Sequence, residues 1–380
     1  TPEETNRAVK KFIAAGLVGP RLCTDTPTMD GIDPDHPLAW SSVAANGMPL
    51  FALPEWHTML DGIDLENLDI ECPLDTSSSG YTFFVFLLAL SEERGFPIDQ
   101  LRGSIINDPI HSHLVVMDKD FPTDVARRVT TDLIEFDLKY TPRLYPFVPC
   151  GYDISEGGAN AFQEIAFNIG IATQYLEDAR ARGINLDDVP PVAFSLCGKV
   201  DFFETVAKCR AIGRMWAKVA RERLGITNPK KWGCRMGIET AGSASQREKP
   251  INNISRITIA MLAAVLGGAQ SVNPTQIAEQ HGLASEESRI WDQDVHHMIA
   301  HETNVALTAD PLGGSYYVEA LTNEIEKKAN EFLKEVDAQG GMWESLKSGW
   351  LEKQLLQSIL TREREIEDKK RILVGTNMFQ

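Results

Sequence analysis

The sequence predicts an α/β protein built on parallel strands, and three observations lead to this fold class. Short apolar and β-branched runs alternate with helix-length segments along the 380 residues. The runs recur every 30–45 residues or so (about one strand–helix unit with a long helix). No Gly-rich G-x-G-x-x-G segment follows an early strand, which disfavours an open dinucleotide-binding sheet. We therefore predict a (β/α)8 TIM-type barrel rather than an open doubly wound sheet.

The predicted strands mark the start of each unit. They are the segments 68–72, 104–106, 147–150, 192–196, 233–238 and 269–272. The clearest helix follows the third strand, because its apolar side chains recur every three or four residues and share one face: Phe162, Ile165, Ala166, Ile169, Ala172 and Leu176.

Polar residues directly after the third predicted strand are candidates for a functional site. Active sites of barrels lie at the carboxyl ends of the strands, and Asp153 and Glu156 follow such an end. A turn closed by an Asx-type hydrogen bond explains the same residues equally well.

The C-terminal part of the chain differs from the rest in its pattern. From Tyr316 onward the sequence is typical of helices, and the charged stretch 361–370 predicts a solvated helix surface. We therefore predict a barrel over residues 1–315 and a C-terminal helical extension over 316–380.

Composition restricts the partners and the compartment. The net charge of −17 repels phosphate backbones and disfavours nucleic acid as a partner. The six cysteines include no C-x-x-C pair, which favours reduced thiols and a cytoplasmic protein. The longest apolar run, 83–90, is shorter than the ~18 residues of a membrane span. The first residues lack the pattern of a signal peptide.

Two pairs of histidines raise the question of a metal site. His297 and His301 lie one helical turn apart, and His111 and His113 alternate. A protein metal site needs a third ligand, and neither pair has a cysteine or carboxylate partner at a typical spacing. Ordinary packing explains both pairs, so we predict no metal ligands here.

Several motifs, in their order along the chain, resemble those of the methylmalonyl-CoA mutase family. The similarity extends over nearly the whole chain, and it rests on the segments 1–16, Asp25-Thr26-Pro27-Thr28, Asp33-Pro34-Asp35-His36-Pro37, Ser104-Ile105-Ile106-Asn107-Asp108, 151–159, 310–321, Gly340-Gly341-Met342 and Val374-Gly375-Thr376-Asn377. Segment 151–159 resembles the family's G-Y-H-M-Q-E-A-G-A element, and 310–321 resembles D-P-W-G-G-S-Y-Y-V-E-A-L.

This resemblance implies a fold, a cofactor and a reaction. In the family a (β/α)8 barrel encloses an acyl-CoA, and adenosylcobalamin caps the mouth of the barrel. Homolysis of the cobalt–carbon bond produces a radical that removes a substrate hydrogen, and the carbon skeleton then rearranges. The resemblance thus implies an isomerase in which the protein encloses and orients the reactants.

The resemblance also assigns candidate site residues. Glu279 stands where the family has a glutamate on the adenosyl ribose, Glu156 and Gly242 match positions that contact cobalamin, and Thr275 replaces an asparagine near the ribose. Tyr152 and Asp153 occupy the catalytic positions, although the family has a histidine at the position of Asp153. The expected substrate-binding positions carry Ser104 for a threonine, Ile106 for a glutamine, Val116 for an arginine and Glu239 for a glutamine near the corrin.

These replacements predict a substrate other than methylmalonyl-CoA. Without an arginine at position 116, a substrate carboxylate loses its bidentate partner and is buried unpaired. An ionised Asp153 cannot donate to a thioester carbonyl, but it can accept from a hydroxyl, an amine or an amide. We expect a less acidic acyl-CoA. A related acid that is not a CoA ester is the alternative, because Pro191 falls where a CoA-binding arginine is usual.

The resemblance implies partners as well. The family's cobalamin-binding D-x-H-x-x-G signature does not occur in residues 1–380, so we predict no cobalamin-binding domain in this chain. We expect a separate small cobalamin-binding subunit, and hence a hetero-oligomer or dimer. We also expect the family's pantetheine-binding stretch to lie upstream of Thr1. The alternative is a non-catalytic structural subunit, or a repurposed member of the family that has lost mutase activity.

Overall fold

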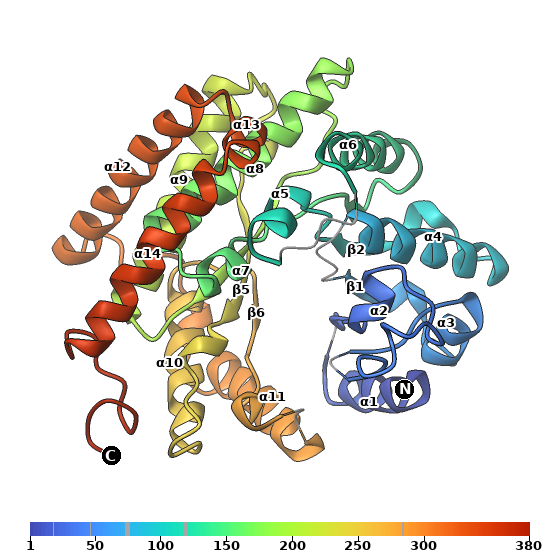
Figure 1. Ribbon diagram of the computed structural model, residues 1–380, viewed down its shortest axis with the longest axis horizontal. Helices are drawn as coiled ribbons and strands as arrows, with labels where there is room; N and C mark the ends of the chain where they lie inside the picture. The colour runs from blue at the N-terminus through green and yellow to red at the C-terminus, as the bar shows by residue number, and fades with distance from the viewer. Residues whose placement is uncertain (18, 46, 73–76, 117–120, 283–284) are drawn as a thin grey trace. The chain divides into compact units, whose positions relative to one another are not determined.

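A computed structural model describes residues 1–380 apart from 18, 46, 73–76, 117–120 and 283–284 (Figure 1). The chain divides into two compact units. Unit 1 comprises Thr1–Pro149 and Tyr175–Pro190, and unit 2 comprises Cys150–Gln174 and Pro191–Gln380. Helix α8 (Ala161–Ala181) crosses the division.

Unit 1 contains a three-stranded parallel sheet in the order β1-β2-β3. Its strands are β1 (Asp69–Cys72), β2 (Arg102–Ile105) and β3 (Leu144–Tyr145). The crossovers contain α4 (Ser77–Glu93) after β1 and α6 (Thr123–Tyr140) after β2. The other helical segments are α1 (Pro2–Ala14), α2 (Thr26–Met29), α3 (Leu53–Met59), η1 (Leu65–Asn67), η2 (Ile98–Gln100), α5 (Pro109–His111) and η3 (Ser112–Val116).

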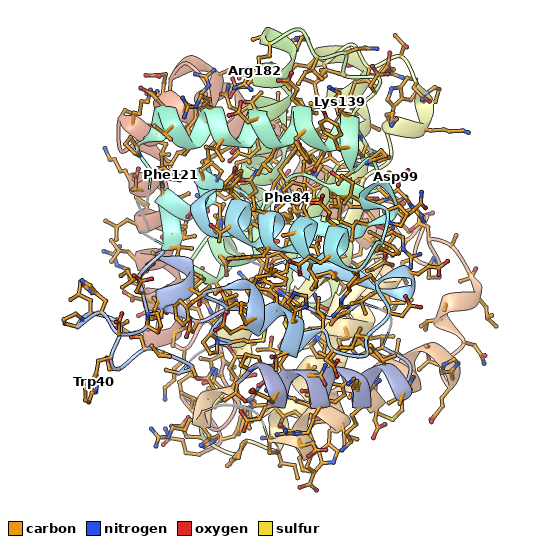
Figure 2. All side chains as sticks on the ribbon, turned by 90° about the vertical axis from the view of Figure 1, so that its right-hand side faces the viewer. Trp40, Phe84, Asp99, Phe121, Lys139 and Arg182 are labelled. Atoms are coloured by element: carbon orange, nitrogen blue, oxygen red, sulfur yellow. The ribbon has the colours of Figure 1, made fainter. Side chains whose placement is uncertain are left out.

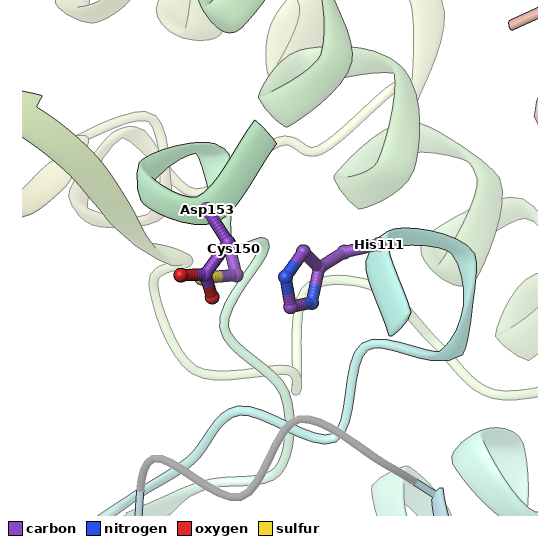
Figure 3. A group of neighbouring side chains, drawn as sticks. All are labelled: His111, Cys150 and Asp153. Carbon is purple, nitrogen blue, oxygen red and sulfur yellow. The ribbon is translucent and has the colours of Figure 1, made fainter. Parts of the chain in front are cut away.

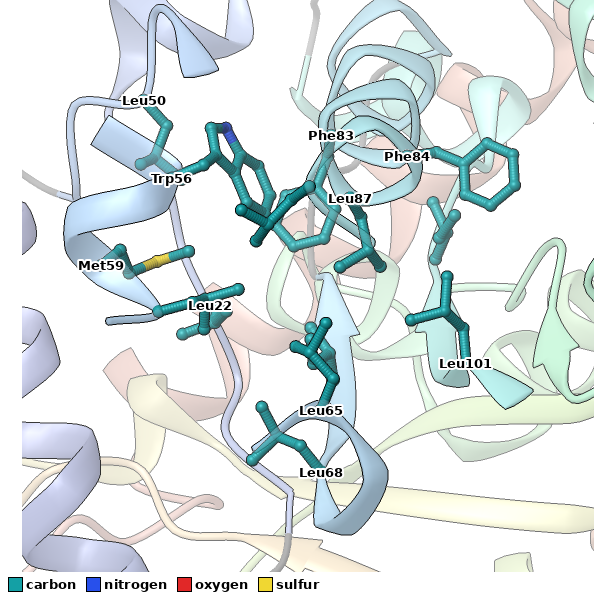
Figure 4. Close-up of a cluster of buried hydrophobic side chains, with 14 of the residues drawn as sticks. Leu22, Leu50, Trp56, Met59, Leu65, Leu68, Phe83, Phe84, Leu87 and Leu101 are labelled. Atoms are coloured by element: carbon teal, nitrogen blue, oxygen red, sulfur yellow. The ribbon is translucent and has the colours of Figure 1, made fainter. Parts of the chain in front are cut away.

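The core of unit 1 lies between its sheet and its helices (Figure 4). Ile70 of β1 and Ile105 of β2 belong to the same buried cluster as Trp56, whose ring meets that of Phe83 edge-on at 4.5 Å. Phe84 on α4 packs against the ring of Phe136 on α6, whereas Trp40 is 89 % exposed (Figure 2). Burial of these apolar faces is the main favourable term that holds α4 and α6 on the sheet.

Unit 2 contains a second parallel sheet, in the order β4-β5-β6. The strands are β4 (Ala193–Gly198), β5 (Arg235–Thr240) and β6 (Ser271–Asn273). Helices α9 (Phe202–Lys218) and α10 (Asn252–Leu266) lie in the two crossovers. The remaining segments of the unit before residue 316 are α7 (Gly151–Glu156), η4 (Val219–Arg223), η5 (Pro229–Lys231), η6 (Gly242–Ala244), η7 (Glu279–His281), α11 (Glu286–His301) and η8 (Val305–Leu307).

The C-terminal residues form three helices, α12 (Tyr316–Ala338), α13 (Met342–Lys347) and α14 (Trp350–Glu367). Helix α12 begins at Tyr316, as predicted, and packs on α9. Ion pairs tie the two helices together, including Arg210 to Glu319 at 2.7 Å and Arg214 to Glu326 at 2.6 Å. Among the described residues, none of the helices has both the length and the apolar character that a membrane crossing requires.

Five of the six predicted strands overlap strands of the structure, and the segment 147–150 does not. Strand β3 lies earlier, at Leu144–Tyr145, and Cys150 forms only an isolated bridge with Ser195. Pro146 and Pro149 explain the difference, because proline has no N–H to donate to a sheet. The parallel α/β fold is confirmed. The closed barrel and the boundary at residues 315/316 stay predictions.

Candidate functional site

The candidate site in unit 2 begins where Cys150 bridges β4 and leads into α7. The first residue of α7 must be small, because a Cβ on Gly151 would lie 1.8 Å from Asn168 Nδ2. Asn168 in turn donates to the Ser195 carbonyl of β4, at 3.4 Å. This close packing of α7 on α8 and β4 places Tyr152, Asp153 and Glu156 on one short helix.

Asp153 is half-buried and accepts a hydrogen bond within this helical turn. The Cys150 thiol donates to its Oδ2 at 3.2 Å (Figure 3). An ionised carboxylate offers only acceptors. In this geometry Asp153 is therefore equipped to receive a proton donor such as a hydroxyl group.

Tyr152, the other residue assigned to catalysis, is half-buried and stays protonated. Burial is the main cause that raises the pKa of its phenol well above the ordinary value, and the negative charge of Glu156 adds to it. A tyrosine in this state is a neutral donor and acceptor of hydrogen bonds.

The carboxylates of Glu156 and Glu279 both lie close to Gly242. A Cβ on this glycine would lie 3.0 Å from Glu279 Oε1 and 3.4 Å from Glu156 Oε2. Ser243 holds Glu156 in place: its backbone N–H donates to Oε2 at 2.7 Å, and its hydroxyl donates to Oε1 at 2.8 Å. The structure thus brings together three of the four residues predicted to bind the cofactor.

The two carboxylates influence each other. Glu279 is exposed as a residue, yet the partial burial of its carboxyl group and the negative charge of Glu156 raise its pKa. Gln280, the next residue, donates from Nε2 to the Gly242 carbonyl at 3.0 Å and so fixes this turn beside the glycine.

Thr275, the fourth predicted cofactor residue, is buried and bonded to the end of β5. Its backbone N–H donates to Thr240 Oγ1 at 2.7 Å, and its hydroxyl donates to the Thr240 carbonyl. Glu239 lies on β5, half-buried, in register with Cys197 on one side and Asn273 on the other.

Three predicted substrate-binding residues belong to unit 1. Ser104 is half-buried on β2, and Ile106 is buried directly after that strand. Val116 ends η3 with 40 % of its surface exposed.

The sequence reasoning missed the buried ion pair beneath the site. Lys208 Nζ lies 2.7 Å from Glu164 Oε2, with side chains 3 % and 0 % exposed. Glu164 Oε1 also accepts from the backbone N–H of Cys197 at 2.8 Å, and Lys208 donates to the carbonyl of the same residue. Burial by itself lowers the pKa of Lys208, but the charge and hydrogen bond of Glu164, together with the neighbouring Cys197, outweigh burial, and the pKa is raised. A lysine among the apolar residues 206–209 was the available signal.

Cys197 connects this ion pair to the site. It lies near the end of β4, and its thiol donates to Glu156 Oε1 at 3.7 Å. Burial is the main cause that raises the pKa of this thiol, which therefore stays protonated. At the end of β4, the backbone of Cys197 is thus held by the buried charges of Glu164 and Lys208, and its thiol contacts the Glu156 carboxylate.

The class of protein is an α/β protein with parallel strands, in which two carboxylates approach Gly242 directly after β5. Over residues 1–380 the chain matches the family model described as methylmalonyl-CoA mutase, and it belongs to that family. It is 33 % identical over 380 residues to the 2-hydroxyisobutanoyl-CoA mutase large subunit of Aquincola tertiaricarbonis. The matched region covers all of this chain and 67 % of that relative.

The methylmalonyl-CoA mutases are similar over the same region. The protein of Rhizobium meliloti (strain 1021) is 31 % identical over 385 residues, and that of Homo sapiens is 28 % identical over 381 residues. This chain is covered completely in both cases, but it spans only 53 % and 50 % of those relatives. The chain therefore corresponds to about half the length of the methylmalonyl-CoA mutases.

Proposed function

We propose that this chain is the substrate-binding, catalytic part of an adenosylcobalamin-dependent mutase. In this proposal the protein isomerises an acyl-CoA other than methylmalonyl-CoA by a radical 1,2-rearrangement. The observation that carries the proposal is that the carboxylates of Glu156 and Glu279 both approach Gly242, in a member of this family, and that Glu156 shares helix α7 with Tyr152 and Asp153.

We propose that the two sheets are parts of one (β/α)8 barrel. The support is that every strand pairing within each sheet is parallel and that helices lie in the crossovers, as in barrels. In such a barrel the segments after β4 and β5 belong to the end that carries the active site.

The residues around Gly242 fit a cobalamin cofactor. Glycine leaves open the space that a side chain would fill between the two carboxylates, and carboxylates accept hydrogen bonds from ribose or amide groups. We propose that Glu279, Glu156, Gly242 and Thr275 hold adenosylcobalamin, which when bound supplies a carbon radical for hydrogen abstraction.

In this proposal the chain's own residues orient the substrate and exclude water. Asp153 accepts a hydrogen bond from a substrate hydroxyl, and neutral Tyr152 donates one without providing a charge. Ser104, Ile106, Val116 and Glu239 line the substrate region. Ile106 and Val116 cannot pair with the free carboxylate of a malonyl-type acyl-CoA. A hydroxyacyl-CoA, which has no such carboxylate, therefore fits better.

The relative named 2-hydroxyisobutanoyl-CoA mutase large subunit supports this class of substrate. We propose a hydroxyacyl-CoA such as 2-hydroxyisobutanoyl-CoA for this chain. The words "large subunit" also support a smaller partner, and we propose that this partner binds cobalamin and supplies the cobalt ligand.

The test compares substitutions at Asp153 in the assembled enzyme. Loss of the acceptor in Asp153→Ala should lower kcat/KM for the hydroxyacyl-CoA by roughly 100-fold. Asp153→Asn keeps an acceptor oxygen at the same place and should lose less. Equal activity of the Ala variant and the parent would refute the role of Asp153.

The second candidate is a structural subunit without mutase activity, and it is favoured by the loss of substrate-contacting residues at Ile106 and Val116. A titration of adenosylcobalamin into the chain with its partner distinguishes the two. No binding at any concentration would favour the structural subunit over the enzyme.

A further inference from the structure

Helix α14 packs directly on the turn between α7 and α8, within unit 2 (Figure 1). Ser358 donates from its hydroxyl to Gln163 Oε1 at 2.7 Å. Gly158 has φ +113, and a Cβ there would lie 2.2 Å from Ile359 Cγ1. The turn that follows Glu156 therefore depends on a glycine to admit the C-terminal helix.

One turn further along α14, Arg362 reaches Ser243. Its Nη2 donates to Ser243 Oγ at 2.9 Å, and Ser243 Oγ lies 2.8 Å from Glu156 Oε1. A hydroxyl has one hydrogen, and arginine has no acceptor. The direction of the chain is therefore fixed from Arg362 through Ser243 to Glu156, and each charge-assisted bond strengthens the next.

The tail beyond α14 contacts the same loop at a second place. Thr376 donates from its hydroxyl to Gln246 Oε1 at 2.8 Å, and Arg256 Nη2 donates to the Val374 carbonyl at 2.8 Å. C-terminal residues thus bond to the loop 241–248 at Ser243 and at Gln246, and to Arg256 on α10, which follows the loop.

We propose that Arg362 is a positioning residue for the cofactor site. It holds the Ser243 hydroxyl so that Ser243 binds Glu156 with both its amide and its hydroxyl, and this keeps the carboxylate beside Gly242. The C-terminal helix is thereby a functional part of the site. The role of Arg362 in cofactor binding rests on the proposed function, whereas the hydrogen bonds by which Arg362 holds Ser243 do not.

Hydrogen exchange of the full chain, followed by mass spectrometry without cofactor, tests the hold. Arg362→Met should speed exchange at the Ser243 amide by about 10-fold, since Glu156 loses its orientation. Arg362→Lys should restore most of the protection, because an ammonium can also donate to the hydroxyl. Arg364→Met is the matched control: Arg364 is exposed on the same helix, and this variant should exchange like the parent.

A second experiment uses Ser243→Ala, which removes the hydroxyl that Arg362 bonds to. If Arg362 acts through the Ser243 hydroxyl, adding Arg362→Met to Ser243→Ala should change the exchange no further. Unchanged exchange in Arg362→Met, or an equal increase in Arg364→Met, would overturn the inference.

Affinity for adenosylcobalamin in the complex with the partner is the functional readout. Arg362→Met should weaken it by about 10-fold, with recovery in Arg362→Lys. A parent protein that binds no cobalamin, together with faster exchange in Arg362→Met, would refute the proposed function while supporting the hold on Ser243. Faster exchange with unchanged cobalamin affinity would overturn the positioning role.

Discussion

At the scale of single residues, the two carboxylates of the candidate site have different surroundings. Glu156 is anchored by two donors from Ser243, and Glu279, which also approaches Gly242, has a raised pKa. An acid with a raised pKa takes up a proton at a higher pH than an exposed glutamate does. As the pH falls, the Glu279 carboxylate therefore becomes protonated, and loses part of its capacity to accept hydrogen bonds, at a higher pH than an exposed glutamate does.

This difference predicts a pH-dependent cofactor affinity. If the Glu279 carboxylate accepts from the cofactor, affinity for adenosylcobalamin is full above its raised pKa and declines as the pH falls through it. Glu279→Gln should bind several-fold more weakly at pH 8 and show a flatter pH profile. Binding titrations between pH 5 and 8 measure this, and Glu287→Gln, on an exposed position of α11, should keep the profile of the parent.

Gly242 allows a test of the space between the carboxylates. In Gly242→Ala the new methyl group would lie 3.0 Å from Glu279 Oε1 and 3.4 Å from Glu156 Oε2, so the Glu279 carboxylate must shift. We expect cobalamin affinity to fall by roughly 10-fold with little loss of thermal stability.

The control for this substitution lies on the same strand–loop unit. Gly233 precedes β5, and a Cβ there meets no atom within 4 Å. Gly233→Ala should bind cobalamin like the parent. Equal affinity of both alanine variants would mean that the space at Gly242 plays no part in binding.

At the scale of elements, the end of β4 depends on the buried pair of Lys208 and Glu164. Both charges bond to Cys197, so the pair fixes the strand as well as neutralising itself. A buried ion pair contributes little net stability, but removal of one partner leaves an uncompensated charge. The stability of the protein is therefore affected most when only one of the two residues is replaced.

Lys208→Met should therefore lower the free energy of unfolding by about 3–5 kcal/mol, as measured by urea denaturation. The double variant Lys208→Met/Glu164→Gln should recover part of this loss. Lys218→Met is the comparison: Lys218 is exposed, and its partner Glu326 keeps a second cation in Arg214, so this change should cost less than about 1 kcal/mol. Similar losses for Lys208 and Lys218 would contradict the account.

Local signals in the sequence predicted elements better than they predicted the site. Apolar periodicity identified α8, and the pattern change at Tyr316 identified the start of α12. Asp153 and Glu156 became candidates because they follow the predicted strand 147–150, but the structure has no strand there. Strand 147–150 was wrong because two prolines outweigh its apolar character.

Contacts between distant segments were beyond the sequence. Ser243 and Glu156 are 87 residues apart, and Arg362 and Ser243 are 119 apart, so no local pattern reports their bonds. The stretch 361–370 is largely exposed, as predicted, but Arg362 is half-buried and bonded. A charged residue in a charged stretch gives no sign that it turns inward.

At the scale of the whole molecule, each unit repeats one plan: a parallel sheet with helices in its crossovers and polar residues after the strands. Of the four predicted cofactor residues, Glu156, Gly242 and Glu279 match the family and Thr275 differs from it. The other differences fall at predicted catalytic and substrate positions. Mostly retained cofactor residues with altered substrate residues are the pattern expected of a mutase with a changed substrate.

The most direct measurement is the rate at which the complex of this chain and its partner isomerises two CoA esters, with and without adenosylcobalamin. The account predicts turnover of 2-hydroxyisobutanoyl-CoA that requires the cofactor. It also predicts a kcat/KM for methylmalonyl-CoA lower by roughly 100-fold, because the free carboxylate of this substrate has no arginine partner where Val116 stands. Efficient isomerisation of methylmalonyl-CoA would contradict the central claim.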